Sequence, residues 1–129
     1  MPGYGELLRR GYEAYARKDT SGIISLLHPE ITAYQSTEVP WGGEYSGLAE
    51  FAAFMGKLTE HVTTVVEVDE IVEAGDRVVA IGRSVGTVNA TGREFEVRAV
   101  HVWHMDGGKA RRLEVYLDTP AMLEALKGA

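Results

Sequence analysis

The sequence predicts an α+β fold in which helices cover one face of a curved, mainly antiparallel sheet. Apolar residues recur at helical spacing through the first sixty residues, whereas residues 66–118 alternate apolar and polar side chains with a period of two. Short segments rich in turn formers separate the later strands, which indicates antiparallel neighbours. Helices first and a meander of strands afterwards are typical of the α+β class.

The N-terminal half is expected to form three helices and one strand. The first helix runs from Tyr4 to Lys18, and Asp19 caps a short second helix that His28-Pro29 ends, because proline disfavours a helical residue before it. A strand is expected over 31–36, followed by the turn-rich loop 38–47. The third helix has an apolar stripe made of Leu48, Phe51, Ala52, Met55 and Leu58.

The C-terminal half is expected to form four strands and a last helix. The first of these strands ends at the hairpin turn 74–76, and the others cover approximately 77–89, 93–105 and 110–118. Thr119-Pro120 then begins a brief helix, because proline is favoured at the first helical position. Asp118 is expected to help cap this helix rather than to serve as a site acid.

Composition favours one folded domain over residues 1–129, with 45% hydrophobic and 25% charged residues. The net charge of −6 and the scattered basic residues argue against a nucleic-acid partner. The absence of cysteine excludes disulfides and cysteine chemistry. Because neither a signal-peptide pattern nor a long apolar run occurs, we expect no membrane association and a cytoplasmic location.

The segment Val97 to Met105 contains the most informative candidate site residue. Alternation places His101 in line with Val97, Ala99, Trp103 and Met105, so a titratable imidazole would lie on an apolar face. This placement suits proton transfer or orientation of a ligand's polar group. The alternative is a core histidine whose ring nitrogens are satisfied by hydrogen bonds.

The other face of the same strand suggests a partner. Val100 and Val102 make the middle of the strand apolar on both sides, so a second protomer would cover the outer face in a homodimer. The alternative is cover by helices or loops of the same chain. No two histidines have the spacing of a metal pair, and no nucleotide-binding loop is present, so we expect neither a metal nor a cofactor.

Four local motifs together resemble the nuclear transport factor two-like superfamily, and within it the SnoaL-like polyketide cyclases and ketosteroid isomerase relatives. The motifs are Tyr12-Glu13-Ala14-Tyr15 with Lys18-Asp19, Leu27-His28-Pro29-Glu30, Gly43-Glu44-Tyr45-Ser46-Gly47, and Asp106-Gly107-Gly108-Lys109 with Tyr116-Leu117-Asp118-Thr119. The resemblance implies a single SnoaL-like domain with the ketosteroid isomerase-like fold, a conical barrel whose helices and bent sheet enclose one hydrophobic pocket. Members of the superfamily are often dimers.

The resemblance also assigns site residues. His101 matches the pocket-facing His or Asp of the cyclases, but Val115 stands where they have an acidic residue. Gln35 stands at the base position of ketosteroid isomerase, where an amide cannot accept a proton at neutral pH. Tyr12 or Tyr15 corresponds approximately to the isomerase tyrosine of the first helix.

The expected pocket therefore has His101 and Gln35 as catalytic residues and a wall that binds substrate. The wall residues are Tyr12, Tyr15, Trp41, Phe51, Met55, Trp103 and Val115. Trp41 lies in a loop that borders the pocket mouth in this family, so it is also a candidate lid. For Phe51 and Met55, plain core packing is the alternative.

Two functions follow from this interpretation. The first is a cofactor-free isomerase, cyclase or dehydratase that acts on a small hydrophobic carbonyl compound, with His101 as acid-base group or oxyanion donor. The second is a non-catalytic module of the same fold that binds a hydrophobic ligand or mediates dimerisation, which Val115 and Gln35 favour because both replace acids.

Overall fold

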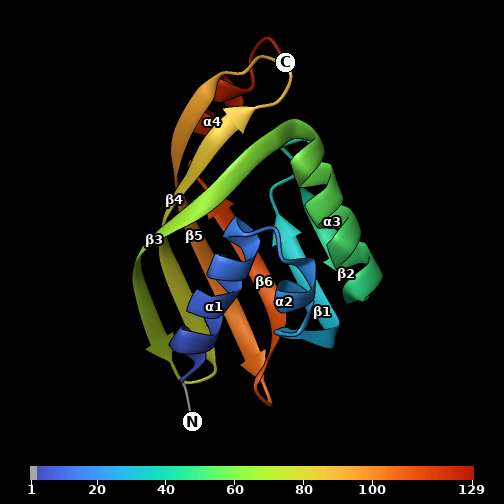
Figure 1. Ribbon diagram of the computed structural model, residues 1–129, viewed down its shortest axis with the longest axis vertical. Coiled ribbons are helices and arrows are strands. Elements are labelled where there is room, and N and C mark those ends of the chain that lie inside the picture. The colour runs from blue at the N-terminus through green and yellow to red at the C-terminus, as the bar shows by residue number, and fades with distance from the viewer. Residues whose placement is uncertain (1–2) are drawn as a thin grey trace.

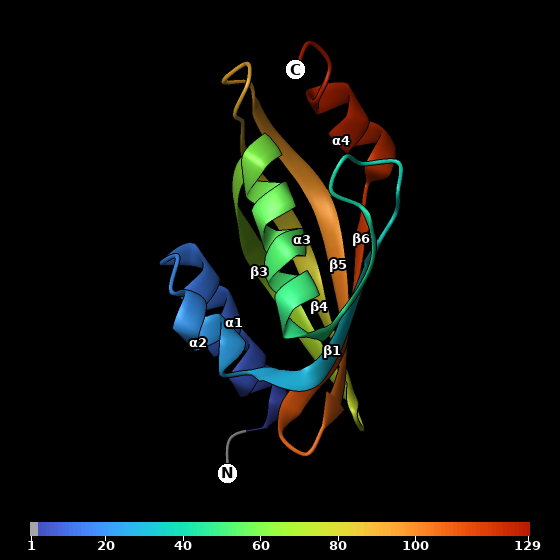
Figure 2. The ribbon, with the colours of Figure 1, turned by 90° about the vertical axis from the view of Figure 1, so that its right-hand side faces the viewer.

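Residues 3–129 of the computed structural model form one bent six-stranded sheet with helices on its inner face (Figures 1 and 2). Met1 and Pro2, which the predicted domain includes, lie outside the described residues. The helices are α1 (Tyr4–Ala16), α2 (Thr20–Ile24), α3 (Gly47–His61) and α4 (Thr119–Ala125). The strands are β1 (Leu27–Gln35), β2 (Gly43–Ser46), β3 (Val62–Ala74), β4 (Arg77–Val88), β5 (Glu94–Asp106) and β6 (Lys109–Leu117).

The strand order is β2-β1-β6-β5-β4-β3, and only the β1–β6 pair is parallel among the described strands. The sheet is not closed, since β2 and β3 remain its two edges. Helices α1, α2 and α3 lie on one side of it, and α4 packs beside β5 (Figure 2). The predicted α+β class with helices over a bent, mainly antiparallel sheet is therefore confirmed.

Two expected boundaries in the N-terminal half are wrong. Helix α2 ends at Ile24, and β1 already begins at Leu27, so His28-Pro29 lies within a strand. The strand tolerates Pro29 because its pairing with β6 is interrupted between Leu27 and Thr32, where the missing proline N–H breaks no ladder hydrogen bond. The loop expected over 38–47 also contains β2, a strand too short to show a period of two.

Alternation along the inner strands agrees with the prediction. Ile31, Ala33 and Gln35 of β1 are buried, as are Leu113 and Val115 of β6. The expected caps are also present: Asp19 accepts a hydrogen bond from the Gly22 N–H, and Asp118 accepts one from the Ala121 N–H. Within residues 3–129, no helix combines the length and apolar character needed to cross a membrane.

Strand β4 reaches its curvature through glycine at two inward positions. A Cβ atom at Gly82 would overlap the Glu67 carbonyl of β3, and one at Gly86 would overlap the Thr63 carbonyl. Glycine therefore lets β3 fold closely against β4, and a side chain at either position would push the two strands apart. This close approach contributes to the curl that forms the inner face.

We predict that Gly82→Ala lowers the free energy of unfolding by about 1–3 kcal/mol, because the new methyl group forces the strands to shift. Gly56→Ala is the control: it lies in α3 with nothing within 4 Å of its Cβ position, so it should raise stability by about 0.5–1 kcal/mol. Urea unfolding of the three proteins measures both changes. Equal effects of the two substitutions would contradict this explanation of the bend.

Candidate functional site

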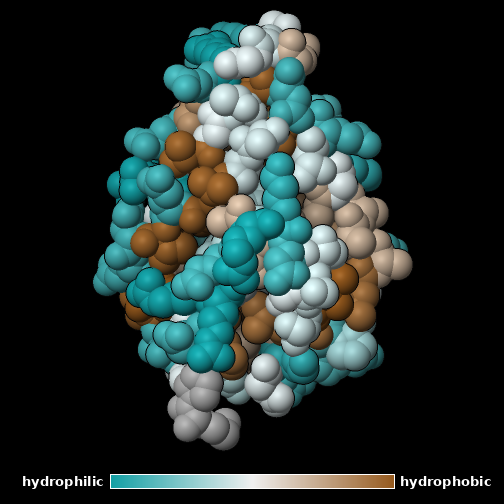
Figure 3. Space-filling model, in the orientation of Figure 1, coloured by the Kyte–Doolittle hydropathy of each residue, from teal (hydrophilic) through white to brown (hydrophobic). Residues whose placement is uncertain are grey.

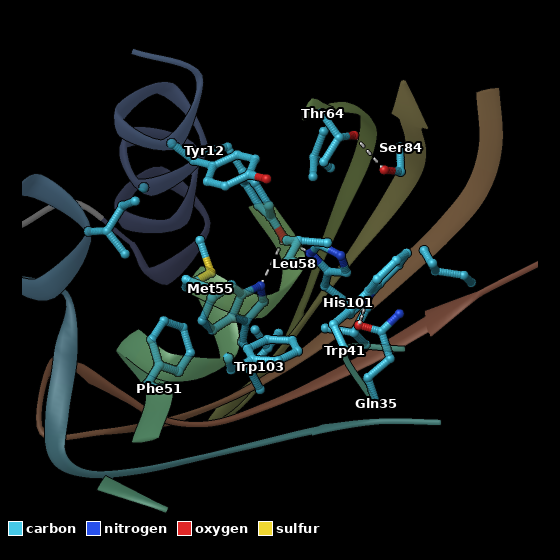
Figure 4. Close-up of a pocket in the computed structure, with 18 of the residues that line it drawn as sticks. Tyr12, Gln35, Trp41, Phe51, Met55, Leu58, Thr64, Ser84, His101 and Trp103 are labelled. Carbon is cyan, nitrogen blue, oxygen red and sulfur yellow. Dashed lines mark hydrogen bonds between the residues drawn. The ribbon is translucent and has the colours of Figure 1, made fainter. Parts of the chain in front are cut away.

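The helices and the inner face of the sheet enclose a cavity with a volume of about 120 Å³ (Figure 4). All nine residues predicted from sequence line it, contributed by α1, α3, β1, β5, β6 and the loop before β2. They are Tyr12, Tyr15, Gln35, Trp41, Phe51, Met55, His101, Trp103 and Val115. The nine residues predicted from the sequence pattern and the family resemblance therefore all lie at the cavity.

His101 is the polar centre of the cavity, and α1 supplies its partner. The Tyr12 hydroxyl lies 2.7 Å from His101 Nδ1, and the Trp103 Nε1–H donates a hydrogen bond of 2.9 Å to the same hydroxyl oxygen. The Tyr12 ring stacks near His101 and meets Trp103 edge-on. The three side chains join the first helix to β5, 89 residues away in the sequence.

The second nitrogen of His101 is available to a ligand. No residue within 3–129 hydrogen-bonds His101 Nε2, yet no fully buried side-chain nitrogen or oxygen in that range lacks a partner. Nε2 therefore borders the open cavity rather than packed protein. The fixed Nδ1 contact leaves Nε2 to face whatever molecule enters.

Burial determines the charge state of these groups. Desolvation lowers the pKa of His101 to about 4, because the imidazolium ion is costly in an apolar cavity. Desolvation likewise raises the pKa of the Tyr12 hydroxyl, with the Trp103 hydrogen bond acting in the opposite direction, and it raises the pKa of Tyr15 to about 12. At neutral pH, His101, Tyr12 and Tyr15 are therefore uncharged.

Gln35 is oriented by Trp41. The Trp41 Nε1–H donates to Gln35 Oε1 at 3.0 Å, and an indole can only donate, so the amide oxygen faces Trp41. The Gln35 Nε2 group, which has no hydrogen-bond partner among residues 3–129, is left as a donor at the cavity. Trp41 itself is 1% exposed and Tyr45 donates to its carbonyl, so it is a buried wall residue here rather than a surface lid.

Strand register places the polar groups in one row. Gln35 pairs with Val115 of β6, and Val115 pairs in turn with His101 of β5. The row therefore reads Gln35, Val115, His101 across three neighbouring strands, all facing the helices. The position where the resemblance to the cyclases implies an acid lies directly between the two predicted catalytic residues, and here it holds an uncharged valine.

Two polar residues of the cavity wall were not predicted from the sequence. Thr64 Oγ1 of β3 and Ser84 Oγ of β4 lie 2.7 Å apart, and Thr64 also donates to the Val85 carbonyl at 3.0 Å (Figure 4). Inward alternation within each strand could have identified them, but isolated hydroxyl residues give no distinctive pattern. Leu58, Phe54 and Met122 are among the further apolar residues of the wall.

The cavity contains no charged side chain among the described residues that line it. Nor do three His, Asp or Glu side chains within 3–129 gather closely enough to hold a metal ion. What remains is a mostly aromatic and aliphatic wall with eight side chains that can form hydrogen bonds: Tyr12, Tyr15, Gln35, Trp41, Thr64, Ser84, His101 and Trp103. Such a site favours an uncharged hydrophobic molecule with a few oxygen atoms.

Comparison with known proteins agrees with this geometry. Residues 8–113 match the family model of the SnoaL-like domain. A nuclear transport factor two-like protein of unknown function from Burkholderia pseudomallei superposes with a TM-score of 0.92 at 28% identity, covering 99% of this chain and 100% of its own. A nuclear transport factor two-like protein from Burkholderia thailandensis gives 0.89 at 29% identity, covering 98% and 99%.

A third similar structure contains a small molecule. TerC, co-crystallised with polyporic acid, superposes with a TM-score of 0.88 at 28% identity, and the match covers 95% of this chain and 97% of TerC. No curated protein matches the sequence. The comparisons therefore identify the family and fold and include one relative with a ligand.

The low pKa of His101 predicts a pH dependence of stability. Between pH 6.5, the ordinary pKa, and about pH 4, the unfolded chain binds the imidazole proton and the folded chain does not. The free energy of unfolding should therefore fall as pH is lowered through this window, by about 2–3 kcal/mol from this group at pH 4.5.

Urea unfolding of wild type and His101→Gln at pH 7 and pH 4.5 measures this contribution. The other titratable groups contribute almost equally to both proteins, so the difference between their pH dependences isolates His101. The wild type should lose more stability on acidification than the variant. Identical losses would show that His101 titrates normally.

Proposed function

The chain belongs to the SnoaL-like family, and from that premise we propose that it is a cofactor-free enzyme acting on a small, hydrophobic, uncharged carbonyl compound. The reaction class is isomerisation, cyclisation or dehydration, all of which begin with movement of a proton next to a carbonyl group. The observation that supports this proposal most strongly is the uncharged His101–Tyr12 pair in a cavity without charged side chains.

The pair can hold its protons in two ways. If the Tyr12 O–H donates to Nδ1, the imidazole proton is on Nε2 and can be donated to a ligand oxygen. If Nδ1–H donates to the Tyr12 oxygen, Nε2 has a free lone pair and the tyrosine O–H can point to the ligand. The second arrangement places a base beside a hydrogen-bond donor.

These two arrangements are linked by one proton relay. His101 Nε2 removes the proton from the carbon next to the carbonyl, and the Tyr12 O–H gives its proton to the carbonyl oxygen. Nδ1–H then returns a proton to the Tyr12 oxygen. The ketone becomes an enol, the imidazole changes tautomer, and no net charge is created. A relay of this kind suits a site where burial disfavours the imidazolium ion.

Delivery of the Nε2 proton to a different carbon, with the relay reversed, completes an isomerisation. The Trp103 N–H stabilises negative charge that develops on the Tyr12 oxygen during transfer.

Gln35 holds a second ligand oxygen through its amide N–H groups and orients the molecule along the row that ends at His101. TerC, which was crystallised with polyporic acid, supports binding of a small molecule in this fold.

The second candidate function is non-catalytic binding of the same class of ligand. Val115 favours it, because the cavity has no carboxylate to act as a strong base between Gln35 and His101. Binding needs only the apolar wall and the hydrogen-bond donors. The two functions differ in one observable, which is whether a bound carbonyl compound exchanges its neighbouring protons.

We predict that the protein accelerates deuterium incorporation into the methyl group of acetophenone in D₂O, followed by proton NMR. His101→Gln should reduce the acceleration by about 10²–10⁴-fold, since general base catalysis is lost. Tyr12→Phe should also reduce it, because the carbonyl oxygen loses its proton donor.

The control is His104→Gln, the same substitution on the outer face of β5, where His104 contacts Glu114 rather than the cavity. It should leave exchange unchanged. Binding of acetophenone without exchange in the wild type would favour the non-catalytic function, and exchange that survives His101→Gln would reject this assignment of the base.

We also propose that the protein forms a homodimer through the outer face of the sheet. A band of apolar side chains crosses four strands there and is flanked by ion pairs: Arg83 contacts Glu67 and Glu96 on one side, and Arg112 contacts Glu44 on the other. The band consists of Tyr34, Val79, Ile81, Val100, Val102 and Tyr116, and Tyr116 is 47% exposed. A second copy related by a two-fold axis would bury the band against itself.

Light scattering at micromolar concentration should give twice the monomer mass of 14.1 kDa. Val102→Lys, in the middle of the band, should give the monomer mass, because it would bury two ammonium groups in an apolar contact. Ile24→Lys on the opposite, helical face should leave the dimer intact. A wild-type monomer would contradict the proposal.

A further inference from the structure

The cavity adjoins a surface groove, and the two share part of their walls. Seven residues line both: Tyr15, Ile23, Leu27, Phe51, Met55, Val62 and Thr64. The groove continues from them between α2 and α3 and over parts of the neighbouring strands β3 and β4. A molecule held at His101 that extended into the groove would pass between these shared residues.

The cavity at His101 is small and the groove is large. The cavity has a volume of about 120 Å³, and the groove has about 780 Å³. Sites for drug-sized ligands usually offer roughly 300–1,000 Å³. A ligand that used only the cavity would be limited to a small ring or a short chain, whereas one that used both the cavity and the groove could be much longer.

The groove is apolar, although it faces solvent. Three of the six exposed large hydrophobic residues among residues 3–129 lie on its rim, namely Ile24, Leu48 and Val65, which are 43%, 36% and 38% exposed. Lys18 is the single charged residue among the described residues that line it. In Figure 3, hydrophobic surface lies on both sides of the polar N-terminal helices, over β3 and over α3. An exposed apolar surface of this kind indicates a binding role.

The boundary between cavity and groove also suits a hydrocarbon chain. Met55 lines both, and its flexible side chain can adapt to the width of a chain that passes it. The Thr64 hydroxyl at the same boundary is already satisfied by Ser84 and the Val85 carbonyl. It therefore requires no polar group on the part of the ligand that passes.

From this shared wall and the exposed apolar groove beyond it we infer that the ligand is elongated, with its carbonyl head at His101 and Tyr12 and an uncharged hydrocarbon tail that leaves between α2 and α3 and lies in the groove. This deepens the proposed function and depends on it for the position of the head. The substrate class becomes a carbonyl compound with an alkyl or aryl chain, rather than a compact ring system buried completely in the cavity.

The test uses acetophenone and its 4-methyl, 4-propyl and 4-butyl derivatives, with dissociation constants from NMR titration of the wild type. Each methylene that reaches the groove should tighten binding about two- to fourfold, as expected for partial to full burial of a CH₂ group. The gain should then vanish in Ala52→Trp, because Ala52 lies on the exposed face of α3 that lines the groove and an indole there fills it.

Ala53→Trp is the matched control. Ala53 is the next residue of α3, is also exposed, and does not line the groove or the cavity. It should keep the gain with chain length, and both variants should bind acetophenone as the wild type does. Circular dichroism and thermal unfolding establish that both variants are folded.

A wild type whose affinity does not increase with chain length overturns the inference, whether or not acetophenone binds. A gain that persists in Ala52→Trp overturns it too, because the tail would then lie elsewhere. Failure of the proposed function gives a different result. Affinity for the ketones would still increase with chain length, and Ala52→Trp would still abolish this increase. His101→Gln, however, would leave both their affinity and deuterium exchange unaltered.

Discussion

The hydroxyl group of Tyr12 is the contact on which the geometry of the site depends. It accepts a hydrogen bond from Trp103 and meets His101 Nδ1, so one oxygen atom joins α1 to two residues of β5. Removal of this oxygen would leave two partly buried polar groups without a partner, at a cost of about 1–3 kcal/mol for each. The same contact fixes the imidazole ring and leaves Nε2 facing the cavity. Stability and proposed reactivity therefore share one interaction.

Absence of charge is the second constraint. The inner row of the sheet holds Gln35, Val115 and His101 on neighbouring strands, and none of them is charged at neutral pH. A carboxylate at position 115 would stand beside the imidazole and favour its protonated form. With valine there, His101 stays neutral at neutral pH, and its Nδ1 contacts the Tyr12 hydroxyl.

Much of this arrangement could be predicted from the sequence, because it depends on period and register. Alternation along Val97 to Met105 placed His101 inward, and the family resemblance placed Gln35 and Val115 inward on their strands. Contacts between distant side chains were not predictable in the same way. The Tyr12–His101 distance depends on how α1 crosses the sheet, and local spacing says nothing about that crossing. Strand β2 was not predicted because four residues are too few to show alternation. The strand around Pro29 was not predicted because proline argues against a strand, and the sequence does not show that the β1–β6 pairing is interrupted there.

The central claim is that His101 is a neutral imidazole, bound at Nδ1 by Tyr12 and free at Nε2 to meet a ligand. Nitrogen-15 NMR of the histidine side chains tests it most directly, because the two ring nitrogens have different chemical shifts in each tautomer and equal protonation in the imidazolium ion. The account predicts that His101 remains neutral at pH 6, with an Nδ1 shift that changes in Tyr12→Phe. An imidazolium spectrum at pH 6, or an Nδ1 shift that Tyr12→Phe leaves unaltered, would contradict it.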